Sequence, residues 1–232
     1  MAAAFNSAGT VTRVVGATSI NYTGITVGSG SNRALVLFMT FGANVSGDTF
    51  TATWDSGGTN QTMTLIGKGQ ENTWSRWSYA WGLIAPTSGN LTLAVSWTTS
   101  SDARACAADV TEADQTGGVT TFRNFTTANG NTATPTVSIT SASGNIPMAC
   151  CVNSDGAVTA RSNTTIGEGT SGDPPLWSQY DAAASGTTVF TWSMTSNTWG
   201  AIGFDIVAAG GGGGGDTGWG LRLAGQRNRH IA

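Results

Sequence analysis

The sequence predicts an all-β protein, and three observations support this. Apolar residues recur at every second position in short stretches bounded by Gly, Asn, Ser and Asp, the period of a half-buried β-strand. These stretches follow one another along most of the 232 residues, and no window has a convincing 3.6-residue helical stripe. Nine tryptophans and eight phenylalanines supply bulk for packed sheets. We therefore expect a jelly-roll-like sandwich of two sheets.

The predicted strands form two groups. The first group has regular alternation and turn residues at its ends, and it comprises 34–41, 49–54, 63–66, 76–84, 91–97 and 103–111. The second follows a change of texture near Gly117 and comprises 136–140, 145–152, 177–180, 188–194 and 199–207. The two groups divide a body of residues 1–209 into halves of about 1–116 and 117–209.

The second half repeats features of the first. Residues 89–97 lead through a Thr/Ser turn to a strand that contains Asp109, and residues 186–194 lead in the same way to a strand that contains Asp205. Two architectures fit: one jelly-roll-like sandwich, or two tandem seven-strand sandwiches. We favour the single sandwich, because a second half of roughly 90 residues with few large apolar side chains would bury a thin core alone. The equivalent places of the two aspartates indicate a repeated structural role.

The last 23 residues differ from the body. Six glycines, 210–215, form a flexible tether, since glycine loses more conformational freedom on ordering than any other residue. The peptide 216–232 follows, and its apolar and basic side chains are of the types that dominate interfaces. We predict that it docks on a partner through Trp219, Leu221, Arg222, Leu223, Arg227 and Arg229. Alternation at 221–223 suits addition to a sheet edge.

Charge and composition exclude several partners. Three arginines and one aspartate give the peptide 216–232 a charge of +2, so the body carries −5 of the overall −3. An acidic body disfavours nucleic acid, and the weakly basic peptide suits an acidic protein groove better. No apolar run reaches the ~18 residues of a membrane span. Residues 1–7 lack the features of a secretory signal, so we expect synthesis in a host cytoplasm.

The residues of catalytic and metal sites are scarce. The single histidine, His230, lies in the tail, which removes histidine-based triads and zinc sites from the body. Cys106, Cys150 and Cys151 lack metal-binding spacing, and the adjacent pair points to opposite sheet faces. Paired carboxylates for glycoside cleavage remain conceivable around Asp109. We expect no enzyme activity and no cofactor.

A row of aromatic residues has two interpretations. Trp77, Tyr79 and Trp81 alternate along one strand and share a face, with Trp74 just before them. The rings could form a flat platform for sugars, or the core layer between two sheets. Small or polar residues between them, such as Ser78 and Ala80, are typical of an outward face, so we favour the core.

Several motifs resemble a recurrent β-sandwich module of phage virion proteins and large bacterial surface proteins. They are Trp-Gly-Leu-Ile-Ala-Pro at 81–86, Gly-Asn-Leu-Thr-Leu-Ala-Val at 89–95, Glu-Ala-Asp-Gln-Thr at 112–116 and the stretch 199–209. The resemblance covers most of 10–209 and implies a structural or adhesive role. We expect a bacteriophage virion protein, a capsid decoration, cement or tail fibre subunit bound to other virion proteins and to itself as a homotrimer. The alternative is an adhesin for host glycans.

Overall fold

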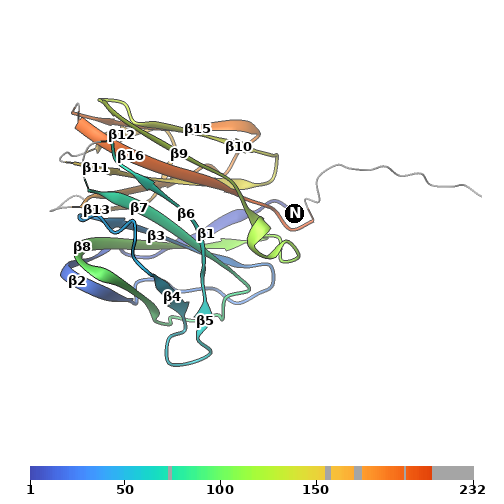
Figure 1. Ribbon diagram of the computed structural model, residues 1–232. Coiled ribbons are helices and arrows are strands. Elements are labelled where there is room, and N and C mark those ends of the chain that lie inside the picture. Colours follow the sequence, from blue (N-terminus) through green and yellow to red (C-terminus); the bar gives the residue numbers. More distant parts are fainter. Residues whose placement is uncertain (73–74, 155–157, 170–173, 196, 211–232) are drawn as a thin grey trace, which may run out of the picture.

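The computed structural model describes residues 1–72, 75–154, 158–169, 174–195 and 197–210. The body is built from antiparallel β-strands, which confirms the all-β sandwich prediction (Figure 1). In the described part, the helical structure is one 3₁₀ turn, η1, at Gly118–Thr121, and no helix is long and apolar enough to cross a bilayer.

The first half contains eight strands in two layers. They are β1 (Ala4–Ala8), β2 (Thr12–Tyr22), β3 (Ala34–Phe41), β4 (Thr51–Trp54), β5 (Gln61–Thr62), β6 (Thr64–Gln70), β7 (Trp77–Ile84) and β8 (Leu93–Thr111). The inner layer runs β1/β2-β8-β3-β7-β6, and the outer layer runs β2-β8-β4-β5. β2 and β8 belong to both layers: residues 19–22 pair with 93–96 in the outer layer, and residues 12–14 pair with 103–105 in the inner one.

The second half repeats this arrangement. Its strands are β9 (Phe122–Thr132), β10 (Thr136–Ser141), β11 (Ile146–Asn153), β12 (Val158–Arg161), β13 (Thr164–Gly169), β14 (Leu176–Tyr180), β15 (Gly186–Met194) and β16 (Asn197–Ile206). The inner sheet has the order β9-β16-β11-β14-β13 and the outer sheet β10-β15-β12. β11 thus takes the place of β3, and β16 that of the end of β8.

The two halves pack through their inner sheets, which gives four layers with the outer sheets outermost (Figure 1). The central core combines side chains of β3 and β8 with those of β11 and β16, and Phe38 lies 5.7 Å from Phe204 between ring centroids. β3 and β11 are therefore buried along their whole length on both faces. Among the described residues, every pairing between the named strands stays within 4–111 or within 122–206, and the isolated bridge between Ala113 and Ala208 joins the two halves, so the body has two sandwiches that share a core. The second half, which has few large apolar side chains of its own, therefore completes its core against the first half.

One predicted turn is wrong. Residues 91–97 and 103–111 were expected as separate strands, but β8 runs unbroken from Leu93 to Thr111. The intervening residues include no Gly or Pro, and their backbone is held from the side: Asp48 accepts hydrogen bonds from the amides of Thr98 and Thr99, and Gly42 donates to the Asp102 carbonyl. The equivalent passage in the second half does break, between β15 and β16.

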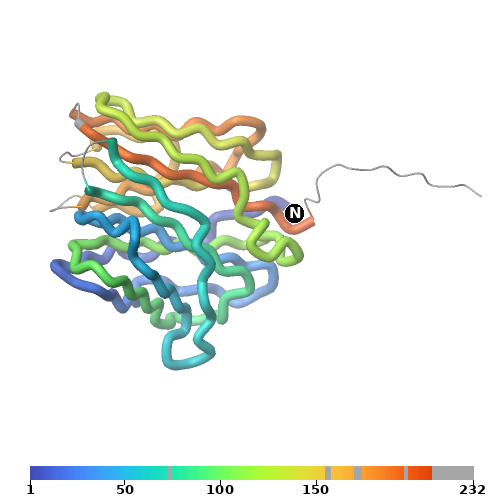
Figure 2. The backbone as a smooth tube through the Cα atoms, viewed as in Figure 1, coloured from blue at the N-terminus to red at the C-terminus, as the bar shows by residue number. Residues whose placement is uncertain are grey.

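The chain leaves the body beside its own beginning. The Met1 amine donates to the Ala209 carbonyl at 3.1 Å, and the tube view in Figure 2 shows the N-terminus next to the last described residues. Gly210, with a φ of 74°, is the last described residue. The point from which residues 211–232 depart is therefore fixed in the structure.

Candidate functional site

The row of aromatic residues at 77–81 lies mostly inside the first half. Tyr79 and Trp81 are 1% and 3% exposed, and their rings stack at 5.4 Å between centroids. The Tyr79 hydroxyl donates to the Val45 carbonyl, and burial raises the pKa of that phenol. Trp77 is half-buried, with the Lys68 ammonium 5.5 Å from its ring centroid. Trp74 lies outside the described residues.

The core interpretation of this row is therefore the one that the structure supports, and a flat exposed platform is not available at Tyr79 and Trp81. The intervening Ser78 and Ala80 are also fully buried. They are small because they face the second half, where the two inner sheets approach closely. A Cβ atom at the next such position, Gly82, would collide with the Phe122 ring.

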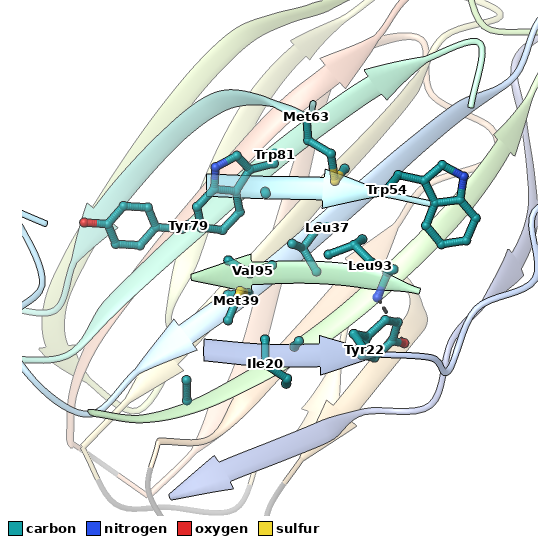
Figure 3. Close-up of a cluster of buried hydrophobic side chains, with 14 of the residues drawn as sticks. Ile20, Tyr22, Leu37, Met39, Trp54, Met63, Tyr79, Trp81, Leu93 and Val95 are labelled. Carbon is teal, nitrogen blue, oxygen red and sulfur yellow. Dashed lines mark hydrogen bonds between the residues drawn. The ribbon is translucent and has the colours of Figure 1, made fainter. Parts of the chain in front are cut away.

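An open pocket lies at the side of the first sandwich, between β4 and β5 of the outer layer and β6 and β7 of the inner layer. Its volume is about 320 Å³, at the lower end of the range for small-molecule sites. Ala52, Met63 and Trp81 form its buried part, and Figure 3 shows Met63 and Trp81 together at this side of the core. Phe50 and the 46%-exposed Leu65 line it nearer to solvent.

Four of the nine lining residues are polar, Asp48, Thr51, Thr53 and Thr62, and hydrogen bonds within the body engage Asp48 and Thr51. The Asp48 carboxylate accepts hydrogen bonds from the Thr99 amide and hydroxyl, both at 2.7 Å, and from the Thr98 amide at 3.1 Å. Partial burial raises the pKa of Asp48, but these hydrogen bonds outweigh it and leave the pKa below its usual value. The Thr51 hydroxyl is shared with Ser96 at 2.7 Å. The pocket thus combines apolar walls with three threonines and a single anionic group at its edge.

Sequence reasoning missed this pocket because its walls come from three separate segments of the chain, 48–53, 62–65 and Trp81. Trp81 was singled out as one of a row, but Phe50, Met63 and Leu65 each read as an ordinary apolar residue of a strand. Phe50 lies 5.6 Å from Trp81 and 4.7 Å from Tyr79 between ring centroids.

Asp109 and Asp205, the aspartates at equivalent places in the two halves, occupy equivalent buried positions. Asp109 forms an ion pair with Arg33 and accepts hydrogen bonds from Asn6 at 2.8 Å and from the Gly28 amide at 3.1 Å. Asp205 accepts hydrogen bonds from Ser141 at 2.7 Å and Asn145 at 2.6 Å.

Both aspartate side chains are fully buried. Burial raises the pKa of Asp205, against the lowering effect of its hydrogen bonds. These contacts agree with the repeated structural role predicted for the pair, since each aspartate binds the residue just before the central strand of its half.

The cysteines are buried thiols. Cys150 faces the central core and its neighbour Cys151 faces the core of the second half, as expected for adjacent strand residues. Burial raises the pKa of the Cys106 thiol to about 12, so it is protonated at neutral pH. No thiolate nucleophile is available at that position.

The residues just before the glycine tract are bound to both halves of the body. Two backbone hydrogen bonds join this segment to the first half. The Val207 carbonyl accepts from the Asp114 amide at 2.8 Å, and the Ala209 amide donates to the Glu112 carbonyl at 2.6 Å. Val207 also donates to the Thr121 carbonyl at 2.9 Å, and the Ala208 amide donates to Asn145 Oδ1 at 3.0 Å. The tether thus starts from a rigid point.

The predicted docking residues of the tail, Trp219, Leu221, Arg222, Leu223, Arg227 and Arg229, lie outside the described residues, as do most of the tether 210–215 and the whole peptide 216–232. Comparison with protein-family models, curated proteins and solved structures finds no match for this chain.

Proposed function

We propose that the chain is a structural subunit of a bacteriophage virion, a capsid decoration, cement or tail fibre protein held in place by its C-terminal peptide. The observation that carries this proposal is the transition at residues 207–210. A backbone segment hydrogen-bonded to both halves of the body is followed directly by six glycines and an arginine-bearing peptide. A folded body joined by a glycine tract to a short peptide is an arrangement suited to docking on neighbours.

Charge and reach support the same proposal. The body carries −5 and the peptide 216–232 carries +2, so the peptide is attracted to surfaces of the kind that the body itself presents. Six glycines span at most ~20 Å when extended, which reaches an adjacent subunit. Tethering raises the local concentration of the peptide to on the order of millimolar, so that modest contacts suffice. The resemblance of the strand motifs to virion and surface modules agrees with such a role.

The glycan-binding alternative loses the platform on which it was based. Two of its rings, Tyr79 and Trp81, are core residues, and the third, Trp77, is half-buried beneath Lys68. Trp77→Ala is expected to lower stability, as truncation of a packed tryptophan does, with no specific change in glycan affinity. We therefore keep assembly as the proposal.

Deletion of residues 216–232 tests the proposal. The variant is expected to fold as the full chain does, because every described strand pairing lies before residue 207, but to be lost from the particle. The measurement is mass spectrometry across a density gradient of the source lysate, with the full chain in parallel. Full-length chain that never sediments with a megadalton particle would refute the virion role. Loss of folding on deletion would refute the tail as a separate docking element.

A further inference from the structure

The pocket between β4 and β6 has the chemistry of a receptor for an aromatic side chain next to a cation. Its floor and walls are Phe50, Met63, Leu65 and Trp81, which offer ring and thioether contacts to a flat apolar group. Asp48 at its edge is ionised at neutral pH, since its hydrogen bonds lower its pKa.

The chain itself carries a segment with the complementary chemistry. Trp219 is the aromatic residue of the C-terminal peptide, and Arg222 follows it three positions later. Trp and Arg are the residue types that most often anchor interfaces, and they do so in water-excluding pockets. From Gly210 to Trp219 the chain spans at most about 30 Å. The length of chain beyond the described body thus suffices to reach a neighbouring molecule.

We infer that Trp219 of one copy occupies the pocket between β4 and β6 of a second copy, with Arg222 facing Asp48. This inference rests on the proposed function, because it names the surface on which the docking peptide acts. The contact is heterologous, since tail and pocket are different surfaces. Repetition of a heterologous contact closes a ring or extends a filament, and three such contacts would close the predicted trimer.

The experiment is a complementation test with the full chain. Trp219→Ala removes the anchor but keeps the pocket, whereas Leu65→Asp spoils the pocket but keeps the tail. In sedimentation velocity over a concentration series, the wild-type chain is expected to associate. Each variant alone is expected to need at least about tenfold more protein for half-association, the effect of losing one interface anchor. An equimolar mixture of the two variants is expected to form one-to-one dimers, since it retains one intact tail and one intact pocket per pair.

Two controls keep the test decisive. Val189→Asp places the same charge at a hydrophobic residue with the same exposed fraction, 46%, but on the outer sheet of the second half. It is expected to associate as the wild type does. Circular dichroism and thermal unfolding establish that Leu65→Asp is folded; if it is not, Leu65→Gln takes its place.

The outcomes separate this inference from the proposed function. A Leu65 variant that associates like the wild type, or a mixture that stays monomeric, overturns the inference. So does a wild-type chain that is monomeric throughout, as a tail folded into its own pocket would be. If the deletion of 216–232 still removes the chain from the particle in those cases, the virion role stands and the tail has another partner.

Discussion

At the scale of single residues, the body depends on a few buried charged groups that pair with opposite charges, such as Arg33 with Asp109. Arg33 and Asp109 form an ion pair with side chains 7% and 0% exposed, and Asn6 and Gly28 complete the acceptor bonds of the carboxylate. Burial lowers the pKa of Arg33. Such a pair contributes little net stability compared with apolar residues, but breaking it leaves a charge in the interior without compensation.

Asp109→Asn is therefore expected to destabilise the protein by about 3–5 kcal/mol, the usual cost of removing one partner of a buried pair. Asp102→Asn is the matched control, because Asp102 pairs with Arg13 at side-chain exposures of 28% and 33%. It is expected to cost about 0–1 kcal/mol. Urea denaturation of both variants measures the difference, and equal losses would show that the burial of the Asp109 pair has no energetic consequence.

At the scale of elements, glycines on inner strands allow the two sandwiches to approach. Ile66-Gly67-Lys68-Gly69 in β6 and Ile166-Gly167-Glu168-Gly169 in β13 occupy equivalent edges, exactly 100 positions apart, and each strand has a bulge at the same place. A Cβ atom at Gly69 would lie 2.6 Å from Ile202, and one at Gly169 would lie 2.6 Å from Arg104, each across the interface between the halves. These glycines therefore set the spacing of the inner sheets.

Gly200→Ala is expected to be among the most disruptive small substitutions. Its Cβ atom would lie 2.6 Å from the backbone carbonyl group of Gln70, which cannot rotate away as a side chain can. We expect a loss of about 1–3 kcal/mol from overpacking. Gly47→Ala, where a Cβ atom meets nothing within 4 Å, is the control and should change stability by less than about 0.5 kcal/mol. Thermal unfolding compares the two, and equal midpoints would argue against tight packing at Gly200.

At the scale of the whole molecule, the halves are similar in strand order but not independent. The central core draws on both, and residues such as Val36, Phe38, Met148 and Phe204 have no exposed surface. Either half alone would expose that apolar face to water. The interface between the halves thus behaves as a core and not as a domain contact.

Residues 1–116 and 117–209 produced separately are expected to aggregate or to remain partly unfolded, whereas their co-expression should give a soluble complex. Size-exclusion chromatography and near-ultraviolet circular dichroism provide the measurement. A half that unfolds cooperatively as a soluble monomer would contradict a shared core.

The sequence predicted the strands where one face is apolar and the other polar, as at 188–194. It also predicted β3 and β11, which are buried on both faces, but it predicted less where small residues or glycine replace large side chains. Ser78 and Ala80 resemble residues of a solvent-exposed face, but both are buried. Small residues occur on exposed faces and also where two sheets approach closely, so their type does not distinguish the two cases. β13 was missed because Thr164–Gly169 has little alternation of apolar and polar residues. Its similarity to β6 is visible only when the two strand sequences are aligned. The pocket could not be predicted, since it depends on the spacing between sheets.

The attachment of residues 207–209 has a mechanical consequence. Val207 and Ala209 are bonded to the segment 112–114 of the first half, while Val207 and Ala208 are also bonded to Thr121 and Asn145 at the start of the second. A pull on the chain beyond Gly210 would load these hydrogen bonds together and divide the force between both sandwiches. The force would act first on these hydrogen bonds and not on the outer sheets. Both sandwiches would therefore resist the pull together, at the place where Met1 and Ala209 lie side by side.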